Sequence, residues 1–459
     1  MQADTIAAIA TPLGDGGISV IRVSGSEAIS IVDRLYRGAS RLLDVASHTV
    51  NYGKIVDPLS KKMLDEAIVL IMKAPRSFTA EDVVEIQCHG GMQITNSILG
   101  CLLRNGARLA EPGEFSKRAF LNGRLDLMQA ESIADLIRAK SDRAQETALL
   151  QLRGKASDKI REIRKKLVSL MAHVEVNIDY PEHDVESMTF HEIDRVCSDV
   201  VAEMDRWLAN AKQGKLIREG VRTVLIGKPN VGKSSLMNRF VREERAIVTD
   251  IPGTTRDVIE EWIHIGGYAL RLFDTAGLRE TSDLVEQIGV ERTKEALDRA
   301  DLVLFVVNGN EELTTEEYEL VRQLRGRPSI IIINKSDLDR TLDFDQLKLV
   351  IDDISPVIQV SALNGSGFDE LENQIVSILG TGSVDLDDSV LLNRLRHIEL
   401  TEQAKQFLVD AIQAVVLGVP IDLIQIDLRN AWETIGLLIG ETSSESLLDE
   451  LFSQFCLGK

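Results

Sequence analysis

The hydrophobic positions of the chain follow different patterns in successive stretches. Over residues 1–120, short apolar runs rich in branched side chains alternate with helical patterns. Apolar runs of this length between turn residues are typical of β-strands. The clearest are Thr5–Ala10, Gly17–Gly25, Glu66–Met72 and Asp82–Cys88. We therefore predict an N-terminal α+β domain over residues 1–120.

Residues 121–216 and 382–459 show long helical patterns with few breaking residues. The clearest are Leu125–Lys140 and Ala144–Val176, and the second is long enough to indicate a helical bundle. A short acidic linker, 382–388, opens the second stretch. Helical patterns thus lie on both sides of the segment between them.

That segment, residues 217–381, alternates buried-strand runs with helices, and each run is followed by a polar turn. The runs are Val221–Ile226, Leu270–Phe273, Leu302–Val307 and Ile330–Ile333. Near-continuous apolar strands of this kind are typical of a doubly wound, mostly parallel sheet. The predicted fold class is therefore multidomain α/β and α+β, with an α/β domain inserted into one discontinuous helical domain.

Composition and charge narrow the possible environments and partners. The chain has 459 residues, 44% of them hydrophobic, and a formal net charge of −20. Such an acidic surface disfavours nonspecific binding of nucleic acid and leaves only local contacts. The four cysteines, Cys88, Cys101, Cys197 and Cys456, form neither a zinc pattern nor a disulfide framework. We find neither a signal core nor a membrane-length apolar run, and so expect a cytoplasmic protein with no membrane partner.

One stretch is strongly basic, although the chain as a whole is acidic. The segment 153–166 contains seven basic residues and two acidic ones. A solvated helix face explains this pattern most simply. The alternative is a local contact with an RNA backbone, and the sequence leaves that possibility open.

The segment Gly227–Ser235 matches G-x-x-x-x-G-K-[ST], the loop that cradles nucleotide phosphates. It follows a predicted strand and opens a predicted helix, so that backbone N–H groups converge on the phosphates. Lys233 would contact the β and γ phosphates, and the Ser234 hydroxyl would bind Mg²⁺. The predicted nucleotide-binding residues here are Asn230, Val231, Gly232, Lys233, Ser234 and Ser235.

Two further segments are expected to contact the metal and the γ-phosphate. Asp274-Thr275-Ala276-Gly277 ends the next strand, where Asp274 can hold the metal through water and the Gly277 N–H can reach the γ-phosphate. The segment Thr249–Asp257 lies where a nucleotide-sensitive switch belongs. There Thr255 would complete the Mg²⁺ shell, with Thr249 and Thr254 beside it.

The base specificity is predicted from Asn334-Lys335-Ser336-Asp337. A carboxylate at Asp337 can accept hydrogen bonds from the ring N–H and the exocyclic amine of guanine, a donor pair that adenine lacks. Ser361-Ala362-Leu363 fits the loop that backs the base. Together these motifs predict a GTP-binding G domain.

The residue after the D-x-x-G motif is Leu278, where Ras-like enzymes have a glutamine that orients the attacking water. A leucine cannot orient or polarise water, so hydrolysis needs a substitute. Glu280 and Glu286 lie on a segment expected to move with the nucleotide, and spacing does not choose between them.

These motifs resemble those of the tRNA-modification GTPase family MnmE, also called TrmE. The resemblance covers the whole chain. It includes Pro112–Ser116, Arg118–Asn122, Gly253–Asp257, Asp274–Arg279 and the terminal Phe455–Lys459, which is especially specific to the family.

The resemblance implies an N-terminal domain that binds 5-formyl-tetrahydrofolate or a related tetrahydrofolate and forms a homodimer. It implies folate contacts at Arg22, Glu85, Arg124 and Lys459. It also implies K⁺-dependent hydrolysis, with K⁺ held by Asn230, Thr249, Ile251 and Thr254, and Glu286 as the residue that positions water. The cation would take the place of an arginine finger.

The resemblance further implies a partner, the FAD- and NADH-using protein MnmG, in a heterotetramer or larger assembly. Together they would modify the C5 position of the wobble uridine of tRNA with a one-carbon unit, giving aminomethyl-type groups. Cys456 is an ordinary thiol on its residue pattern alone, or a catalytic thiolate if the tail reaches the folate.

A ribosome-assembly GTPase that binds RNA is the alternative interpretation. Such proteins often carry a G-x-x-G loop after the G domain, and none occurs after Ser361. The terminal Phe455–Lys459 motif favours tRNA modification.

Overall fold

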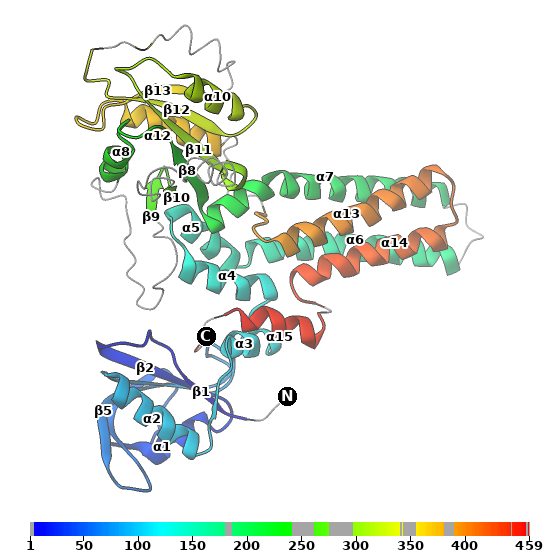
Figure 1. Cartoon of the computed structure of the whole chain (residues 1–459). Coiled ribbons are helices and arrows are strands. Elements are labelled where there is room, and N and C mark those ends of the chain that lie inside the picture. The colour runs from blue at the N-terminus through cyan, green and yellow to red at the C-terminus, as the bar shows by residue number, and fades with distance from the viewer. Residues whose placement is uncertain are drawn as a thin grey trace. The chain divides into compact units, whose positions relative to one another are not determined.

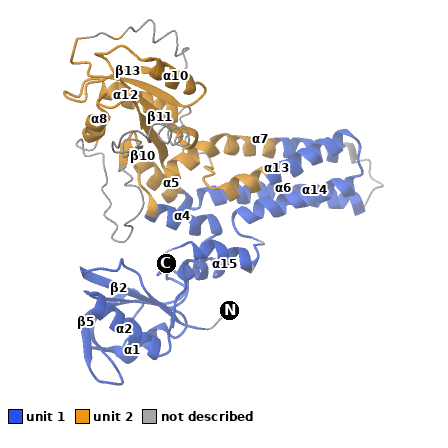
Figure 2. Cartoon of the chain, viewed as in Figure 1, with its two compact units in different colours: residues 1–137, 151–198, 403–459 blue, residues 138–150, 199–402 orange. Residues whose placement is uncertain are grey.

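The computed structural model describes residues 4–179, 186–240, 261–274, 297–339, 342, 355–380, 390–441, 443–455 and 458. The chain divides into two compact units, coloured separately in Figure 2. The first contains residues 1–137, 151–198 and 403–459, and the second contains residues 138–150 and 199–402.

In the first unit, the N-terminal residues form a seven-stranded sheet in the order β3-β4-β5-β6-β2-β1-β7 (Figure 1). The strands are β1 (Ile6–Ile9), β2 (Gly16–Ser24), β3 (Tyr36–Gly38), β4 (Thr49–Val56), β5 (Met63–Met72), β6 (Val83–Gly90) and β7 (Arg108–Leu109). All pairs are antiparallel except β1 with β7. This confirms the four predicted strands and adds β3, β4 and β7. The polar and glycine residues of β4 obscure its alternation.

Helices α1 (Ala28–Leu35) and α2 (Met92–Arg104) cover one face of this sheet and bury its aliphatic side chains. Ile21, Val23 and Ile86 belong to that core. Because successive side chains of a strand point to opposite faces, Arg22 and Glu85 lie on the other face. The two residues are direct partners across β2 and β6.

The remaining helices of the first unit include α3 (Glu114–Leu121), α6 (Lys155–Asp179), α14 (Ile421–Leu438) and α15 (Glu445–Ser453). Helix α6 packs along α14, and α15 packs on α3. Helices α4 (Leu127–Arg138), α7 (Glu186–Glu219) and α13 (Leu395–Val416) each have residues in both units.

The helical pattern over Ala144–Val176 is divided between two helices in the structure. The stretch forms α5 (Asp142–Leu152) and α6, separated by a turn at Gly154 with a φ of +85°. The basic segment 153–166 is also less solvated than a simple surface face. Arg164 is buried, with its guanidinium carbon 4.2 Å from the centroid of the Trp432 ring, and Arg161 forms ion pairs with Asp126 and Asp158.

The second unit contains a six-stranded sheet in the order β13-β12-β11-β8-β10-β9. The strands are β8 (Val221–Ile226), β9 (Glu261–Ile265), β10 (Tyr268–Asp274), β11 (Leu302–Asn308), β12 (Ser329–Asn334) and β13 (Val357–Gln359). All neighbours are parallel except the edge strand β9, which the sequence did not predict. Helices α8 (Lys233–Phe240), α10 (Thr315–Gln323) and α12 (Phe368–Leu379) accompany it (Figure 1).

Apolar clusters cover both faces of this sheet, as the near-continuous hydrophobic strands require. Because β8, β10, β11, β12 and β13 are parallel, their carboxyl ends meet at one edge of the sheet. Ligands bind at this edge in open α/β sheets. None of the helices in the described parts of the chain combines the length and apolar character needed to cross a bilayer. Cys88, Cys101 and Cys197 are buried free thiols.

Candidate nucleotide site and N-terminal pocket

The P-loop connects β8 to α8 at the carboxyl edge of the second sheet. Gly232 has a φ of +97°, and a Cβ placed there would lie 2.2 Å from the Asn334 Nδ2 atom. Asn230 also has a left-handed backbone, with a φ of +65°. Lys233 Nζ donates to the carbonyl oxygens of Gly227 and Lys228, both at 2.6 Å. The lysine is therefore held over its own loop.

Asn334, at the end of β12, connects the P-loop to the predicted base-backing loop. Its Nδ2 donates to the Val231 carbonyl at 2.9 Å, and its Oδ1 accepts from the Ala362 N–H at 3.1 Å. The residue is only 2% exposed. Asn334 thus fixes the spacing of two loops on either side of the predicted base position.

Asp337 is oriented by the same loop. The Ser361 hydroxyl donates to Asp337 Oδ1 at 2.5 Å, and the Asn364 N–H donates to Ser361 Oγ at 3.3 Å. Lys335 has a φ of +65°, which turns the chain between Asn334 and Asp337. A hydroxyl donor fixes the carboxylate in one orientation, as recognition of a base edge requires.

These residues surround a cavity of about 470 Å³. Of the predicted residues, its lining includes Gly232, Ser235, Asn334, Lys335, Asp337, Ala362 and Leu363. Asn238 and Arg239 also line it, and the sequence analysis missed them. They lie three and four residues after Ser235 in α8, on the same helix face, so helical spacing could have found them.

Asp274, Val231 and Ser234 are among the predicted residues that the structure describes but that do not line this cavity. Asp274 ends β10 and pairs with Leu225 of β8, beside the start of the P-loop. Val231 is buried, and Ser234 is exposed in the first turn of α8. The following predicted residues lie outside the described residues: Thr249, Ile251, Thr254, Thr255, Thr275, Ala276, Gly277, Glu286, Cys456 and Lys459.

A second cavity, of about 670 Å³, lies in the N-terminal part of the first unit. Arg22, Glu85 and Arg124, three of the residues predicted to bind a folate, line it together. Arg22 Nε donates to Glu85 Oε1 at 2.9 Å, and each side chain is 17% exposed. The structure therefore places these predicted residues in one pocket.

The aromatic wall of this pocket was not predicted. The guanidinium carbons of Arg22 and Arg124 lie 5.5 Å and 5.2 Å from the centroid of the Phe78 ring. Arg124 NH1 also donates to the Phe78 carbonyl at 2.8 Å. Phe78 lies in a loop between strands, where periodicity gives no signal.

Gly458, near the C-terminus, packs against β1. Gly458 has a φ of +85°, and a Cβ placed there would lie 2.4 Å from the Ile9 carbonyl oxygen. Arg22 NH1 donates to the Gly458 carbonyl at 3.3 Å. Residue 458 therefore contacts a side chain that lines the N-terminal pocket.

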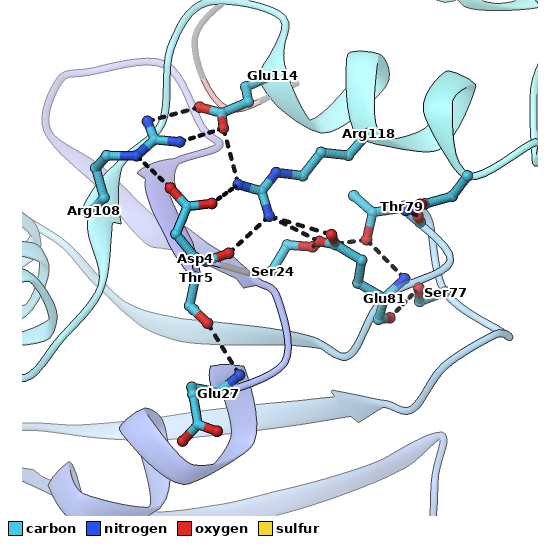
Figure 3. Close-up of polar contacts among 11 residues, drawn as sticks. Asp4, Thr5, Ser24, Glu27, Ser77, Thr79, Glu81, Arg108, Glu114 and Arg118 are labelled. Carbon is cyan, nitrogen blue, oxygen red and sulfur yellow. Dashed lines mark hydrogen bonds and ion pairs between the residues drawn. The ribbon is translucent and has the colours of Figure 1, made fainter. Parts of the chain in front are cut away.

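A partly buried cluster of charges, centred on Arg118 and Glu114, supports the loop that forms one wall of the pocket (Figure 3). Arg118 NH2 donates to Asp4 Oδ1 at 2.7 Å and Glu114 Oε1 at 3.0 Å, and its NH1 donates to Glu81 at 3.3 Å. Glu81 in turn accepts from the Ser24 hydroxyl at 2.7 Å. Burial raises the pKa of Glu114, but hydrogen bonds led by that from Arg108 outweigh burial and hold the pKa below its ordinary value.

Two family models match the chain. One is described as the MnmE helical domain and matches residues 127–456; the other, the GTP-binding protein TrmE N-terminus, matches residues 5–124. A tRNA modification GTPase MnmE from Geobacillus kaustophilus (strain HTA426) is 53% identical over 99% of this chain and 99% of its own length. One from Staphylococcus aureus (strain Newman) is 50% identical over the full length of both.

A solved G domain of the FeoB iron transporter of T. maritima is 27% identical. It covers 34% of this chain and 98% of its own, with a TM-score of 0.26, which is too low to bear on the fold.

Proposed function

The chain belongs to the MnmE family, and from this premise we propose that it couples K⁺-dependent GTP hydrolysis to modification of the wobble uridine of tRNA. The protein is a GTP hydrolase of tRNA modification, as the relatives that match its full length are named. This relation favours tRNA modification over the ribosome-assembly alternative. The rest of the proposal concerns the cation, the folate and the partner.

The observation that carries the nucleotide part is the convergence of three loops on one cavity. The P-loop and the start of α8 supply Gly232 and Ser235, the loop after β12 supplies Asp337, and the loop after β13 supplies Ala362 and Leu363. In the proposed site Asp337 accepts the two guanine donors and Ser234 binds Mg²⁺ with Thr255. Asp337→Ala should therefore abolish the preference for GTP over ATP in a competition binding assay.

The catalytic part of the proposal rests on Asn230 and Glu286. Asn230 is exposed at the P-loop with a left-handed backbone, so its amide oxygen is available to a cation. With Thr249, Ile251 and Thr254 it would hold K⁺, which supplies positive charge as the phosphoryl group is transferred. Glu286 would position the attacking water in place of the glutamine that Leu278 replaces.

Hydrolysis should be at least about tenfold faster in K⁺ than in Na⁺, since a cation in the place of an arginine finger contributes strongly to the rate. Asn230→Ala should remove this difference. Glu286→Ala should slow hydrolysis and leave GTP affinity nearly unchanged. Equal rates in both salts would exclude the cation mechanism, and a parallel loss of affinity would give Glu286 a structural role.

The N-terminal pocket is the proposed site for 5-formyl-tetrahydrofolate. Glu85 can accept a pair of N–H donors from the pterin while Arg22 holds the carboxylate in place. The Phe78 ring lies against the guanidinium groups of Arg22 and Arg124, and so holds both cations at the site. Arg124 and Lys459 would complete the contacts, and Cys456 would take part in the one-carbon chemistry. Calorimetry tests this: Glu85→Ala should lose folate binding that the intact protein shows.

The proposed assembly is a homodimer that acts on tRNA with the flavoprotein MnmG. The flavin chemistry belongs to the partner. We propose that the G domain, 217–381, is inserted into a helical domain made of 121–216 and 382–459, after an N-terminal domain of 1–120. We expect the reaction to take place in the cytoplasm.

A further inference from the structure

The N-terminal pocket carries more positive charge than its own carboxylate can balance. Among the described residues, three arginines line it, Arg22, Arg76 and Arg124, against one acidic residue, Glu85. His48 also lines the cavity. The whole chain has a net charge of −20, so the pocket differs in sign from the average surface. A local excess of positive charge in an acidic protein indicates an anionic ligand.

This excess lies at the solvent-exposed end of the pocket. Arg22 and Glu85 are each 17% exposed and neutralise one another. Arg76 and Arg124 are exposed, and within the described parts of the chain neither guanidinium forms an ion pair. A ligand whose head reaches the Arg22–Glu85 pair therefore has its tail among uncompensated cations.

The strand register gives the direction of that tail. Leu70 of β5 lies opposite Glu85, and Met72 lies two residues further along the same face. Met72 lines the cavity, and the loop that follows it carries Arg76. The His48 N–H donates to the Ile71 carbonyl at 2.6 Å, which sets His48 beside this end of β5. The pocket thus extends from the Arg22–Glu85 pair towards Arg76 and His48.

The loop that carries Arg76 is anchored from behind. Ser77 and Thr79 are buried, and the Ser77 hydroxyl donates to the Glu81 carbonyl at 2.5 Å. Thr79 shares a hydrogen bond of 2.7 Å with Ser24, and Glu81 is held by Arg118 (Figure 3). A loop fixed in this way presents its charge at a defined position and loses little entropy when a ligand binds.

We propose that Arg76, Arg124 and His48 form a subsite for an oligo-γ-glutamyl chain, so that the pocket binds polyglutamylated folates more tightly than the monoglutamyl form. The inference rests on the proposed folate site and specifies its substrate class. A monoglutamyl folate ends in two carboxylates, and each further γ-linked residue adds one. The added carboxylates find cationic partners at the exposed end and leave the contacts of the head unchanged.

Calorimetry on the full-length protein tests this with 5-formyl-tetrahydrofolate bearing one or three glutamyl residues. The triglutamyl form should bind about three- to tenfold more tightly at low salt, as expected for exposed ion pairs, and added salt should reduce the ratio. Arg76→Gln should bring the ratio close to one, and Arg76→Lys should restore most of it. Arg37→Gln is the matched control, since Arg37 lies on β3 at the far edge of the same sheet.

Equal affinity for the two forms in the unaltered protein would overturn the inference, as would a ratio that survives Arg76→Gln. If Arg76→Gln weakens tRNA binding and leaves the ratio unchanged, the charge serves RNA and the inference is wrong. Binding of neither form would instead refute the proposed folate function. An unchanged melting temperature of the Arg76→Gln protein shows that the change acts on the ligand.

Discussion

Replacing Gly458 by alanine should detach the C-terminal end of the chain from the N-terminal pocket. A Cβ at this position would lie 2.4 Å from the Ile9 carbonyl oxygen and 2.9 Å from the Ala10 Cα. Both neighbours are backbone atoms of or beside β1, so no rotation of a side chain can relieve the overlap. The end of the chain should therefore move rather than the strand.

The free-energy cost of Gly458→Ala has two parts. The left-handed conformation of Gly458, with a φ of +85°, costs an alanine about 1–2 kcal/mol. Detachment also removes the hydrogen bond from Arg22 NH1 to the Gly458 carbonyl. Arg22 must then be ordered again when the ligand binds, and a cost of about 1 kcal/mol for this ordering lowers ligand affinity about fivefold. Only the second part acts on the pocket.

Gly418→Ala separates these two parts. Gly418 has a φ of +68° and no atom within 4 Å of a built Cβ, so it shares the backbone cost and lacks the overlap. The assay is calorimetry with 5-formyl-tetrahydrofolate, together with thermal unfolding of both variants. Gly458→Ala should lose about fivefold or more in affinity, and Gly418→Ala should bind like the unaltered protein.

If the two variants bind the folate equally well, the packing of Gly458 against β1 does not support the pocket. If Gly458→Ala unfolds the whole protein at a much lower temperature than Gly418→Ala does, the end of the chain is part of the fold. Either result would refute the reasoning.

Three further predictions concern other parts of the molecule. Gly232→Ala should abolish GTP binding because its Cβ would lie 2.2 Å from a buried amide, whereas Gly326→Ala, with a φ of +76° and open space, should bind GTP normally in a fluorescence titration. Tyr268→Phe should cost about 1–3 kcal/mol in chemical denaturation, because the buried hydroxyl accepts at 2.8 Å and 3.0 Å from two other side chains. The pKa of Glu114 is lowered below 4.5, so its contribution to stability is complete above that pH and is lost as the pH falls through the lowered value. Arg118→Gln should reduce this acid dependence in pH-dependent thermal unfolding.

Periodicity predicted most of the elements because their burial is regular. The strands of the second sheet are buried on both faces, so Leu302–Val307 and Ile330–Ile333 are continuous apolar runs that leave little ambiguity. Edge and irregular elements gave weaker signals. The strand β9 is short and pairs on one side only, and β4 contains Asn51 and Gly53 within its run.

The break between α5 and α6 shows a limit of a different kind. A single glycine inside a helical pattern is tolerated in many helices, so Gly154 alone did not predict a turn. A Cβ there would lie 3.1 Å from Gln129 Nε2, on a different helix. That contact depends on tertiary packing, which periodicity does not report.

The two candidate sites differ in how far the sequence could predict them. The nucleotide cavity is built from contiguous motifs, each of which places its own backbone, so the motifs identified most of its described lining. The N-terminal pocket is built from single residues on separate elements. Arg22, Glu85 and Arg124 came from the family resemblance, and Phe78 and Arg76 emerged only from the folded loop between β5 and β6.

The proposed modification of the wobble uridine of tRNA is best tested in the cell. Wobble uridines of total tRNA would be analysed by mass spectrometry after deletion of the gene and after its return as the unaltered, Asp337→Ala or Glu85→Ala form. C5-modified wobble uridines should disappear on deletion and return only with the unaltered gene. A normal set of C5 modifications in the deletion strain would contradict the proposal.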